Sequence, residues 1–436
     1  MKDNFDLIII GGGILGTSLS YFLSFLNKSK KIAVIEQEHN VAHHTSGRNT
    51  GKVHAPYLYN PEKKKLFANA AFHGYEMWKE YSKLQNLPFK EDGVIEVALD
   101  EKGIKVLEKY LKWGKQNGLE EKDIELIDKT KLKKIEPEIK CEAALYAHRD
   151  GSTDYSILTN SIMKDSKKNG IDFLLEKKVT QIKKNNDKWE ITINEDHKIF
   201  TDFLINAAGG KAIDIAHNIE VAKNLTDVHF RGEYWKTPKK YHSLTKTSVY
   251  SVPEFPDYPF LDPHWIIRVD GSCEIGPNAV PVFSPYGYDT AENIKEFIPK
   301  VFEMLGSGAR KAIFDKQFQE LAFSEIQSSM SKSVMIERVN KFLPKINPKE
   351  ITEKGIAGIR SSVINENGKF VPDVILLEEE TSFHILNYNS PGATGALPFS
   401  AHVINQLHKK GLFESEDIGA QCGPWKFNDI IEKLEK

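Results

Sequence analysis

The segment FDLIIIGGGILGTSLSYFLSF, residues 5–25, constrains the fold of this chain more than any other segment. Residues 6–10 form a near-continuous apolar run, which is typical of a parallel-sheet strand covered on both faces. Gly11, Gly13 and Gly16 then make the pattern G-x-G-x-x-G. In this pattern the glycines permit a tight turn, close approach of a pyrophosphate, and close packing of helix on strand. The segment therefore predicts the phosphate-binding turn of a dinucleotide site.

The residues around this turn indicate an adenine dinucleotide. Ile14 and Leu15 begin a helix whose free N–H groups and positive dipole end would face the phosphates. KIAVIE then predicts a second strand that ends at Glu36. An acidic residue about 20 positions after the glycines is placed to accept the hydrogen bonds of the adenosine ribose. A carboxylate there also argues against the 2′-phosphate of a phosphorylated nicotinamide cofactor.

The polar loop HTSGRNTGKVHAPYLY, residues 44–59, indicates which dinucleotide is bound. A nicotinamide dehydrogenase would continue with further strand–helix units, whereas this loop leads into an amphipathic helix over about residues 61–83. A loop beyond the ribose carboxylate can follow the pyrophosphate toward a redox ring. This arrangement favours an extended, buried FAD. The residues expected to donate to FAD or to let the backbone approach it are Ser46, Arg48, Asn49, Thr50 and Gly51.

Two later segments are expected to complete the FAD site. FLLEKKVTQI and WEITINEDHKIFTDFLINAAGG predict a strand, a hairpin and a buried strand that ends in small residues, although a simple strand-to-turn exit is the alternative. FHILNYNSPGATGALPFSAHVINQL predicts a strand, a loop and a final helix that begins near Ala396. The N-terminus of that helix would stabilise the negative charge of a reduced flavin. The expected FAD-contacting residues are Val179, Ala207, Ala208, Gly209, Gly392, Ala393 and Thr394.

Length and composition exclude several classes of protein. A net charge of −2 in 436 residues gives no support for nucleic-acid binding. No apolar stretch approaches the roughly 20 residues of a membrane span. A strand begins by Asp6, so we expect no signal peptide and a cytoplasmic location, with peripheral contact on the inner face of the membrane left open. Cys141, Cys273 and Cys422 show neither disulfide nor zinc spacing, and no metal site is predicted.

The chain is long enough for two interleaved domains. We expect an α/β fold in which a Rossmann-like FAD-binding domain is assembled from the discontinuous residues 1–84, 150–220 and 351–436. Residues 85–149 and 221–350 interrupt this domain. Each of these two stretches contains segments that predict strands and segments that predict helices. They are expected to form a substrate domain, an antiparallel sheet laid across the flavin with its helices outside.

Several motifs resemble the D-amino-acid-oxidase-type superfamily of FAD oxidoreductases along essentially the whole chain: IIIGGGILG, SGRNTGKVHA, INAAGG, GIRSSVI and SPGATGALP. Within it, HFRGEYW, YSVPEFPDYPFL and DGSCEIGPNAV resemble the L-2-hydroxyglutarate dehydrogenase/oxidase family. The resemblance implies non-covalent FAD and a 2-hydroxy-acid substrate. Residues 48–51 read RNTG where that family usually has His-Asn-Ser-Gly. Residues 390–394 read SPGAT where it usually has Ser-Pro-Ala-Ala-Thr, a variant also similar to malate:quinone oxidoreductases.

Oxidation of a 2-hydroxy acid requires a cation for the carboxylate, a base for the hydroxyl proton, and a hydride acceptor. Arginine holds a carboxylate bidentately, and it is scarce in this lysine-rich chain. Arg360 in GIRSSVI is our first choice for the anchor, and a structural ion pair or a contact with FAD is its alternative. Arg231 in FRGEY is the second choice, with an ion pair to Glu233 as its alternative.

His54, at the end of the loop over residues 44–59, is the expected base, because histidine takes up a proton near neutral pH. Its alternative is a histidine that only hydrogen-bonds the flavin or the backbone. His264 in DPHW is the rival base. Tyr250 and Asn278 are candidate contacts of the substrate, although either could be packing.

The leading hypothesis is FAD-dependent oxidation of an L-2-hydroxy acid, L-2-hydroxyglutarate to 2-oxoglutarate, with hydride transfer to flavin N5. One alternative is a malate:quinone oxidoreductase, and another is an amino-acid or amine oxidase of the same superfamily. A non-enzymatic escort module is a third alternative, which the complete set of FAD motifs argues against. The sequence leaves the electron acceptor open among quinone, oxygen and another flavoprotein.

Overall fold

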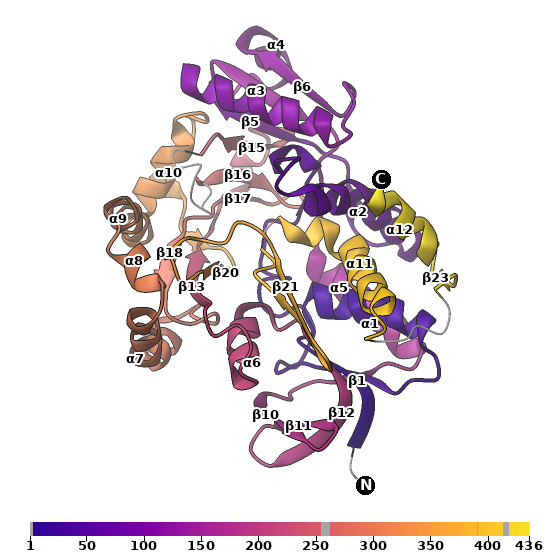
Figure 1. Ribbon diagram of the computed structural model, residues 1–436. Coiled ribbons are helices and arrows are strands. Elements are labelled where there is room, and N and C mark those ends of the chain that lie inside the picture. The colour runs from indigo at the N-terminus through magenta and orange to yellow at the C-terminus, as the bar shows by residue number, and fades with distance from the viewer. Residues whose placement is uncertain (1–2, 254–261, 390, 413–417) are drawn as a thin grey trace.

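The computed structural model describes residues 3–253, 262–389, 391–412 and 418–436 (Figure 1). Residues 254–261 of one motif and Ser390 of another therefore lie outside the described residues. The helices are α1 (Ile14–Leu26), α2 (Lys65–Gln85), α3 (Glu101–Gln116), α4 (Lys129–Ile135), α5 (Tyr155–Lys168), α6 (Ala212–Asn218), α7 (Thr290–Gly306), α8 (Ala309–Ile313), α9 (Lys316–Met330), α10 (Lys332–Asn340), α11 (Ala396–Lys409) and α12 (Phe427–Glu435). Short 3₁₀ helices are η1 (Pro56–Leu58), η2 (Gly209–Lys211), η3 (Lys239–Tyr241), η4 (Pro348–Glu350) and η5 (Gly392–Gly395).

The strands fall into two large sheets and three small ones. The strands are β1 (Asp3–Ile10), β2 (Ile32–Ile35), β3 (Lys52–Val53), β4 (Phe89–Lys90), β5 (Val94–Ala98), β6 (Ile124–Asp128), β7 (Ala143–Ala147), β8 (Gly151–Thr153), β9 (Asp172–Leu174), β10 (Val179–Asn185), β11 (Lys188–Ile193), β12 (His197–Asn206), β13 (Thr226–Gly232), β14 (Trp235–Lys236), β15 (Ser248–Ser251), β16 (His264–Ile267), β17 (Cys273–Gly276), β18 (Val280–Val282), β19 (Glu353–Lys354), β20 (Gly358–Ile364), β21 (Ile375–Glu379), β22 (Ser382–Leu386), β23 (Gln421–Cys422) and β24 (Trp425–Lys426).

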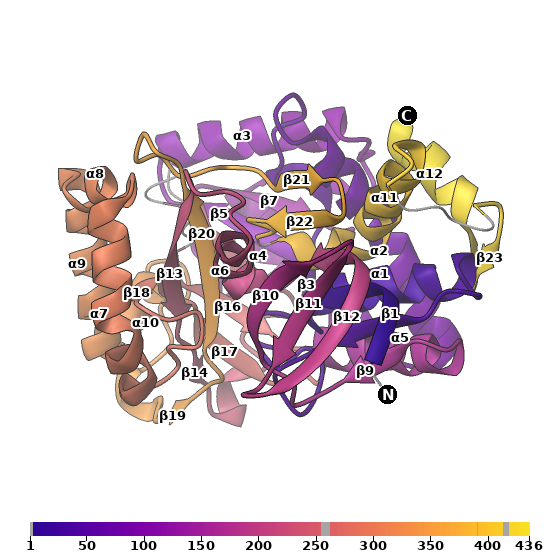
Figure 2. The ribbon, with the colours of Figure 1, turned by 60° about the horizontal axis from the view of Figure 1, so that its bottom comes forward.

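The first large sheet carries the predicted dinucleotide fold. Its strands run in the order β10-β11-β12-β1-β2-β9, and β22 with its hairpin partner β21 joins at β12. β1 is parallel to β2 and β12, and Leu7, Ile8 and Ile9 are fully buried because both faces are covered. Helices α1, α5 and α11 pack on one face, and α6 lies toward the other, beside the hairpin strands seen in front in Figure 2. The expected α/β fold is confirmed.

The second large sheet has the order β19-β14-β17-β16-β15-β5-β7-β6. It was expected to be antiparallel, and it is so except for β5 and β15, which pair in parallel. Ile95, Val249 and Trp265 point to a core that α10 completes. Since side chains alternate along a strand, their neighbours point to the opposite face. The expected division into domains stays a prediction, and β19 comes from beyond its residue 350 boundary.

Two small sheets bring together segments that are far apart in the chain. β3, from the polar loop, pairs with β8, so that Val53 lies opposite Gly151. β13 pairs with β18 and β20, so that Phe230 lies opposite Arg360. The residues on either side of these pairs therefore meet, although about 100 or more residues separate them in the chain.

The C-terminal helix predicted near Ala396 is α11, but it is not the last helix. α12 follows it and packs against α2 and α11, as the yellow helices at the right of Figure 1 show. Phe427 and Ile430 of α12 are buried in the same apolar cluster as α1. Among the described residues, we find no helix with the length and apolarity of a membrane span. Peripheral membrane contact, which the sequence left open, is supported by no feature of the described residues.

Candidate active site

A long pocket follows the carboxyl ends of β1, β2 and β12 and passes the N-terminus of α1. Residues from the beginning, the middle and the end of the chain line it. This is the arrangement that the sequence predicted for an extended dinucleotide. The predicted residues that line the pocket are Gly11, Gly13, Ile14, Leu15, Glu36, Ser46, Asn49, Thr50, His54, Val179, Ala207, Ala208, Gly209, Gly392 and Ala393.

The glycines at the start of α1 are needed for close packing of the backbone. Gly11 has a φ of +109°, and a Cβ there would lie 2.4 Å from the carbonyl oxygen of Ala207. Gly16 does not line the pocket, but a Cβ there would lie 1.9 Å from the carbonyl oxygen of Gly11. Gly16 therefore lets α1 begin directly against β1, which leaves the N-terminal end of the helix open to the pocket.

Glu36 occupies the position expected of a ribose ligand. Its Oε2 accepts the Gly12 N–H at 2.7 Å, and its Oε1 accepts the Glu38 N–H at 2.9 Å. Burial raises the pKa of this carboxyl, while these backbone N–H groups act in the opposite direction. The two hydrogen bonds hold the carboxylate at the pocket wall, where its remaining lone pairs can accept from a ribose.

The polar loop is organised by its own side chains. Ser46 Oγ accepts the Ile14 N–H at 3.0 Å, so that the loop caps the start of α1. Asn49 Oδ1 accepts the Gly51 N–H at 2.8 Å. Arg48 was expected to donate to FAD, but it does not line the pocket. Its guanidinium lies 4.1 Å from the centre of the Tyr288 ring and donates to backbone carbonyls at residues 43 and 357.

The C-terminal segment holds the end of the same loop. Thr394 Oγ1 accepts the His54 N–H at 3.0 Å and lies 3.2 Å from the Tyr155 hydroxyl. Thr394 thus contacts the loop rather than lining the pocket, while Gly392 and Ala393 line it. A Cβ at Gly392 would lie 2.6 Å from the Tyr388 ring. The glycine of SPGAT therefore gives room to that tyrosine.

His54 is held by a carboxylate that the sequence did not single out. Asp150 is fully buried, and its Oδ2 lies 2.7 Å from His54 Nδ1. Its Oδ1 accepts the Ala55 N–H at 2.6 Å. Asp150 precedes the glycine that begins β8, so in the sequence it resembles an ordinary turn residue. Only the pairing of β3 with β8 shows its contact with His54.

The polar face of the second large sheet lies beside this histidine. The ring of Tyr250 is 5.8 Å from that of His54, and it stacks on His264 at 3.7 Å. Burial, followed by the charges of His54 and Arg360, lowers the pKa of His264 to about 3. His264 is therefore neutral and a poor proton acceptor at physiological pH, which disfavours it as the rival base.

The two predicted arginines lie in different surroundings. Arg360 is half-buried on β20, and burial lowers the pKa of its guanidinium, while Tyr234 opposes this shift. Arg231 donates to Glu233 at 2.8 Å and to the carbonyl of residue 287, and Asn278 accepts the Glu233 N–H. Arg360 does not line the pocket, but its charge acts on His264, which stacks on Tyr250, whereas Arg231 and Asn278 belong to a separate hydrogen-bonded group.

Several pocket residues were missed because nothing local distinguishes them. Tyr286 and Pro285 come from the loop after β18 and cover the adenosine end, and the Lys211 ammonium lies 6.0 Å from the Tyr286 ring. Lys52 lines the pocket and is paired with Ser152 and Asp92. These residues converge through tertiary contacts, and no spacing in the sequence would find them.

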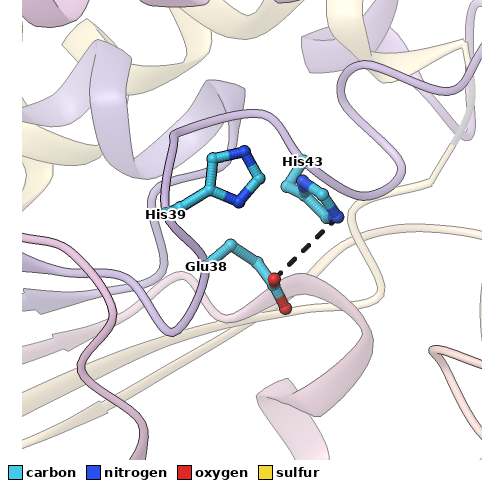
Figure 3. A group of neighbouring side chains, drawn as sticks. All are labelled: Glu38, His39 and His43. Carbon is cyan, nitrogen blue, oxygen red and sulfur yellow. Dashed lines mark ion pairs between the residues drawn. The ribbon is translucent and has the colours of Figure 1, made fainter.

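Glu38, His39 and His43 form a group at the edge of the pocket, drawn in Figure 3. Their potential ligand atoms lie within 4.8 Å of one another, and imidazole with carboxylate suits a divalent transition metal. However, Glu38 Oε1 already lies 2.9 Å from His44 Nε2, and Glu38 Oε2 lies 3.9 Å from His43 Nε2. His39 is exposed. These contacts account for Glu38 without an ion, and we assign no metal here.

The chain is similar to known dehydrogenases over most of its length. L-2-hydroxyglutarate dehydrogenase of Indibacter alkaliphilus is 30% identical over 409 residues, which cover 93% of this chain and 100% of that protein. The Escherichia coli protein of the same name is 25% identical over 404 residues, covering 92% of this chain and 93% of its own length.

Solved structures show the same fold. L-alpha-glycerophosphate oxidase of Mycoplasma pneumoniae with FAD bound superposes with a TM-score of 0.72 at 20% identity, covering 95% of this chain and 96% of that one. Glycine oxidase of Geobacillus kaustophilus gives 0.68 at 14% identity, covering 93% and 95%.

The pocket fits FAD by its own features, namely the open end of α1, the ribose carboxylate, and glycine positions that a Cβ would fill. The family model described as DAO, FAD dependent oxidoreductase, matches residues 6–406. This chain therefore belongs to the DAO family of FAD-dependent oxidoreductases, with FAD as its cofactor.

Proposed function

We propose that this enzyme oxidises an L-2-hydroxy acid, with L-2-hydroxyglutarate as substrate and 2-oxoglutarate as product. The observation that carries the proposal is the buried His54–Asp150 pair at the wall of the FAD pocket, near an arginine on β20. A base and a carboxylate anchor are the two groups that this oxidation requires of the protein. The relatives named L-2-hydroxyglutarate dehydrogenase support this substrate.

In the proposed mechanism, Arg360 binds the substrate carboxylate and turns the α-carbon toward the flavin. His54 accepts the hydroxyl proton at Nε2, since Nδ1 faces Asp150. Tyr250 and His264 form the neighbouring aromatic wall of the site. Bound FAD supplies the acceptor for the hydride of the α-carbon, at its N5. The final electron acceptor, whether quinone, oxygen or another flavoprotein, is left open.

Malate is the second candidate substrate, and one feature of the pocket favours it. SPGAT is similar to the motif of malate:quinone oxidoreductases, and its Gly392 makes room for the Tyr388 ring at the pocket wall. The Tyr388 ring occupies the space that a side chain at position 392 would fill. Oxidation of an amino acid or amine is a weaker alternative, because the relatives that match most of the chain bear the name of a 2-hydroxy-acid dehydrogenase.

An anaerobic titration of the purified holoenzyme tests the proposal. Oxidised-flavin absorbance is followed while L-2-hydroxyglutarate, L-malate or an L-amino acid is added in separate experiments. Bleaching by hydroxyglutarate at the lowest concentration is expected. Bleaching by malate alone would assign the chain to the second candidate. A flavoprotein that none of these compounds bleaches would contradict the proposal while leaving FAD as the cofactor.

A further inference from the structure

Asp150 holds two consecutive residues at once. One oxygen lies 2.7 Å from His54 Nδ1, and the other accepts the Ala55 N–H at 2.6 Å. The β3–β8 pairing places Val53 opposite Gly151 on the adjoining positions of both strands. His54 is also fixed through its own N–H, which Thr394 accepts. The carboxylate therefore cannot turn without losing the Ala55 N–H, and the His54 ring cannot turn without losing Asp150.

The orientation of Asp150 determines where the ring carries its proton. An ionised carboxylate only accepts hydrogen bonds, so His54 must donate from Nδ1. Neutral His54 then has its lone pair on Nε2. When Nε2 takes up a proton, the imidazolium forms beside the buried Asp150 carboxylate, whose Oδ2 lies 2.7 Å from Nδ1.

The groups around this pair come from several elements. The charge of Asp150 acts on Lys52 of β3, Tyr155 of α5 and Glu96 of β5. Tyr250 and His264 lie on the side of His54. Lys52 is already paired with Asp92 and Ser152. Among the described residues, the direct hydrogen-bond partners of the Asp150 carboxylate are the His54 ring and the Ala55 backbone N–H.

We infer that Asp150 is the positioning residue of the oxidation: it fixes the tautomer in which His54 presents an unprotonated Nε2 to the substrate hydroxyl. The inference rests on the proposed function. In the step, the substrate O–H bond breaks and an Nε2–H bond forms. The α-C–H bond breaks as its hydride passes to FAD, and the carbonyl double bond forms from the oxygen electron pair. Asp150 gives up no atom and keeps its charge.

Asp150→Asn is the decisive variant, because its effect on the tautomer is forced. The Ala55 N–H needs an acceptor, so the amide oxygen of the asparagine takes that position. The amide NH₂ then faces His54 Nδ1 and donates to it, and the ring must carry its proton on Nε2. The hydrogen bonds and the volume are conserved, whereas the base is blocked.

The measurement is the rate of anaerobic flavin reduction at saturating substrate, across pH, in the holoenzyme. Asp150→Asn should be slower by about 10²–10⁴-fold, as expected for loss of a general base, with flavin content and KM close to the parent. Its pH profile should lose the rise that the parent shows when its base becomes unprotonated. Asp165→Asn is the matched control, since Asp165 bonds the Tyr81 hydroxyl at 2.8 Å outside the pocket.

His54→Gln separates the failure of this inference from that of the proposed function. A parent that no 2-hydroxy acid reduces would refute the proposed function. A parent-like rate in His54→Gln would refute the assignment of the base. Slow reduction in His54→Gln together with a parent-like rate and pH profile in Asp150→Asn would overturn the inference.

Should Asp150→Asn fail to fold, Asp150→Glu and Asp150→Gln supply the test. These two side chains have equal size, but the first accepts from Nδ1 and the second donates to it. The glutamate variant should reduce its flavin at least tenfold faster than the glutamine variant. Equal rates would overturn the inference.

Discussion

At the residue scale, the polar face of the second large sheet carries buried atoms that lack protein partners. On this sheet, Glu96 Oε2 and both ring nitrogens of His264 have no hydrogen-bond partner among the described residues, and neither does the Tyr57 hydroxyl on the adjacent η1. Leaving such an atom unsatisfied costs about 1–3 kcal/mol. They gather around the His54–Asp150 pair, since Glu96 is level with Tyr250 on the adjacent strand. We expect substrate atoms and water to satisfy them in the working enzyme.

Glu96 should make stability depend on pH. Burial, and then the charge of Asp150, raise the pKa of this carboxyl to about 8. The folded state therefore holds a proton at Glu96 that the unfolded state releases near pH 4.5. The stabilising contribution of protonated Glu96 is complete below pH 4.5 and is lost as the pH rises through about 8. The free energy of unfolding therefore falls over this range.

Glu96→Gln should abolish this dependence, because glutamine is neutral at every pH. Urea unfolding of parent and variant at pH 5, 7 and 9 measures it. Near pH 5 the two should be similar, and at pH 9 the variant should be more stable, by an amount on the order of 1–4 kcal/mol. Glu120→Gln, at an exposed site, is the control. A constant difference between parent and variant at all three pH values would contradict the prediction.

Arg360→Lys tests the proposed carboxylate anchor. An ammonium cannot reproduce the bidentate contact of a guanidinium, and a charge-assisted hydrogen bond contributes about 1.5–3 kcal/mol. The substrate KM should rise roughly tenfold to hundredfold, with the flavin still bound. Arg310→Lys, at an exposed position on α8, should leave steady-state kinetics unchanged. A KM equal to the parent's in Arg360→Lys would remove Arg360 from the substrate site.

At the scale of elements, the contact between β1 and α1 decides whether FAD binds. Gly16→Ala would place a Cβ 1.9 Å from the Gly11 carbonyl oxygen, so α1 must move away from the turn. We expect a colourless protein, measured as the ratio of flavin to protein absorbance, with stability lower by several kcal/mol. In Gly306→Ala, at the end of α7, the added Cβ meets nothing within 4 Å. This variant should keep the flavin content and the stability of the parent. Full flavin content in Gly16→Ala would contradict this account.

The elements that sequence reasoning predicted correctly are those set by local patterns. The glycine turn between β1 and α1, the strand β2 that ends just before Glu36, and the small residues after β12 each depend on a short stretch of sequence. Their chemistry is therefore visible as spacing. The hairpin β10–β11 and the amphipathic helix α2 are likewise determined by residues close together in the chain.

Features that depend on distant pairing could not be predicted in this way. Asp150 contacts His54 only because β3 and β8 pair across about 100 residues, and the parallel pairing of β5 with β15 spans still more. α12 was missed for another reason. It is short, and its apolar side chains become buried only when it packs against α2 and α11. The alternation of polar and apolar residues on β5, β15 and β16 was visible, but not which face would meet the flavin.

At the scale of the whole molecule, FAD should act as a structural ligand. The pocket wall includes residues near positions 11, 207 and 392, so the bound cofactor contacts the beginning, middle and end of the chain. A ligand that binds only the folded state stabilises it by about 2.7 kcal/mol at a concentration 100 times its Kd. Removing FAD should therefore lower Tm by several degrees, and adding it back should restore Tm in proportion to the logarithm of FAD concentration. Calorimetry that shows equal Tm with and without FAD would contradict this prediction.

The contribution of Gly392 and Ala393 to that wall also bears on biosynthesis. A nascent chain has no complete cradle until these residues have left the ribosome, after the segments around positions 11 and 207 have already been synthesised. The sheets made of earlier residues must therefore form without bound FAD, with the polar loop over residues 44–59 already in place. Flavin loading is thus a late event, and colour in a cell extract would report chains whose translation had passed this point.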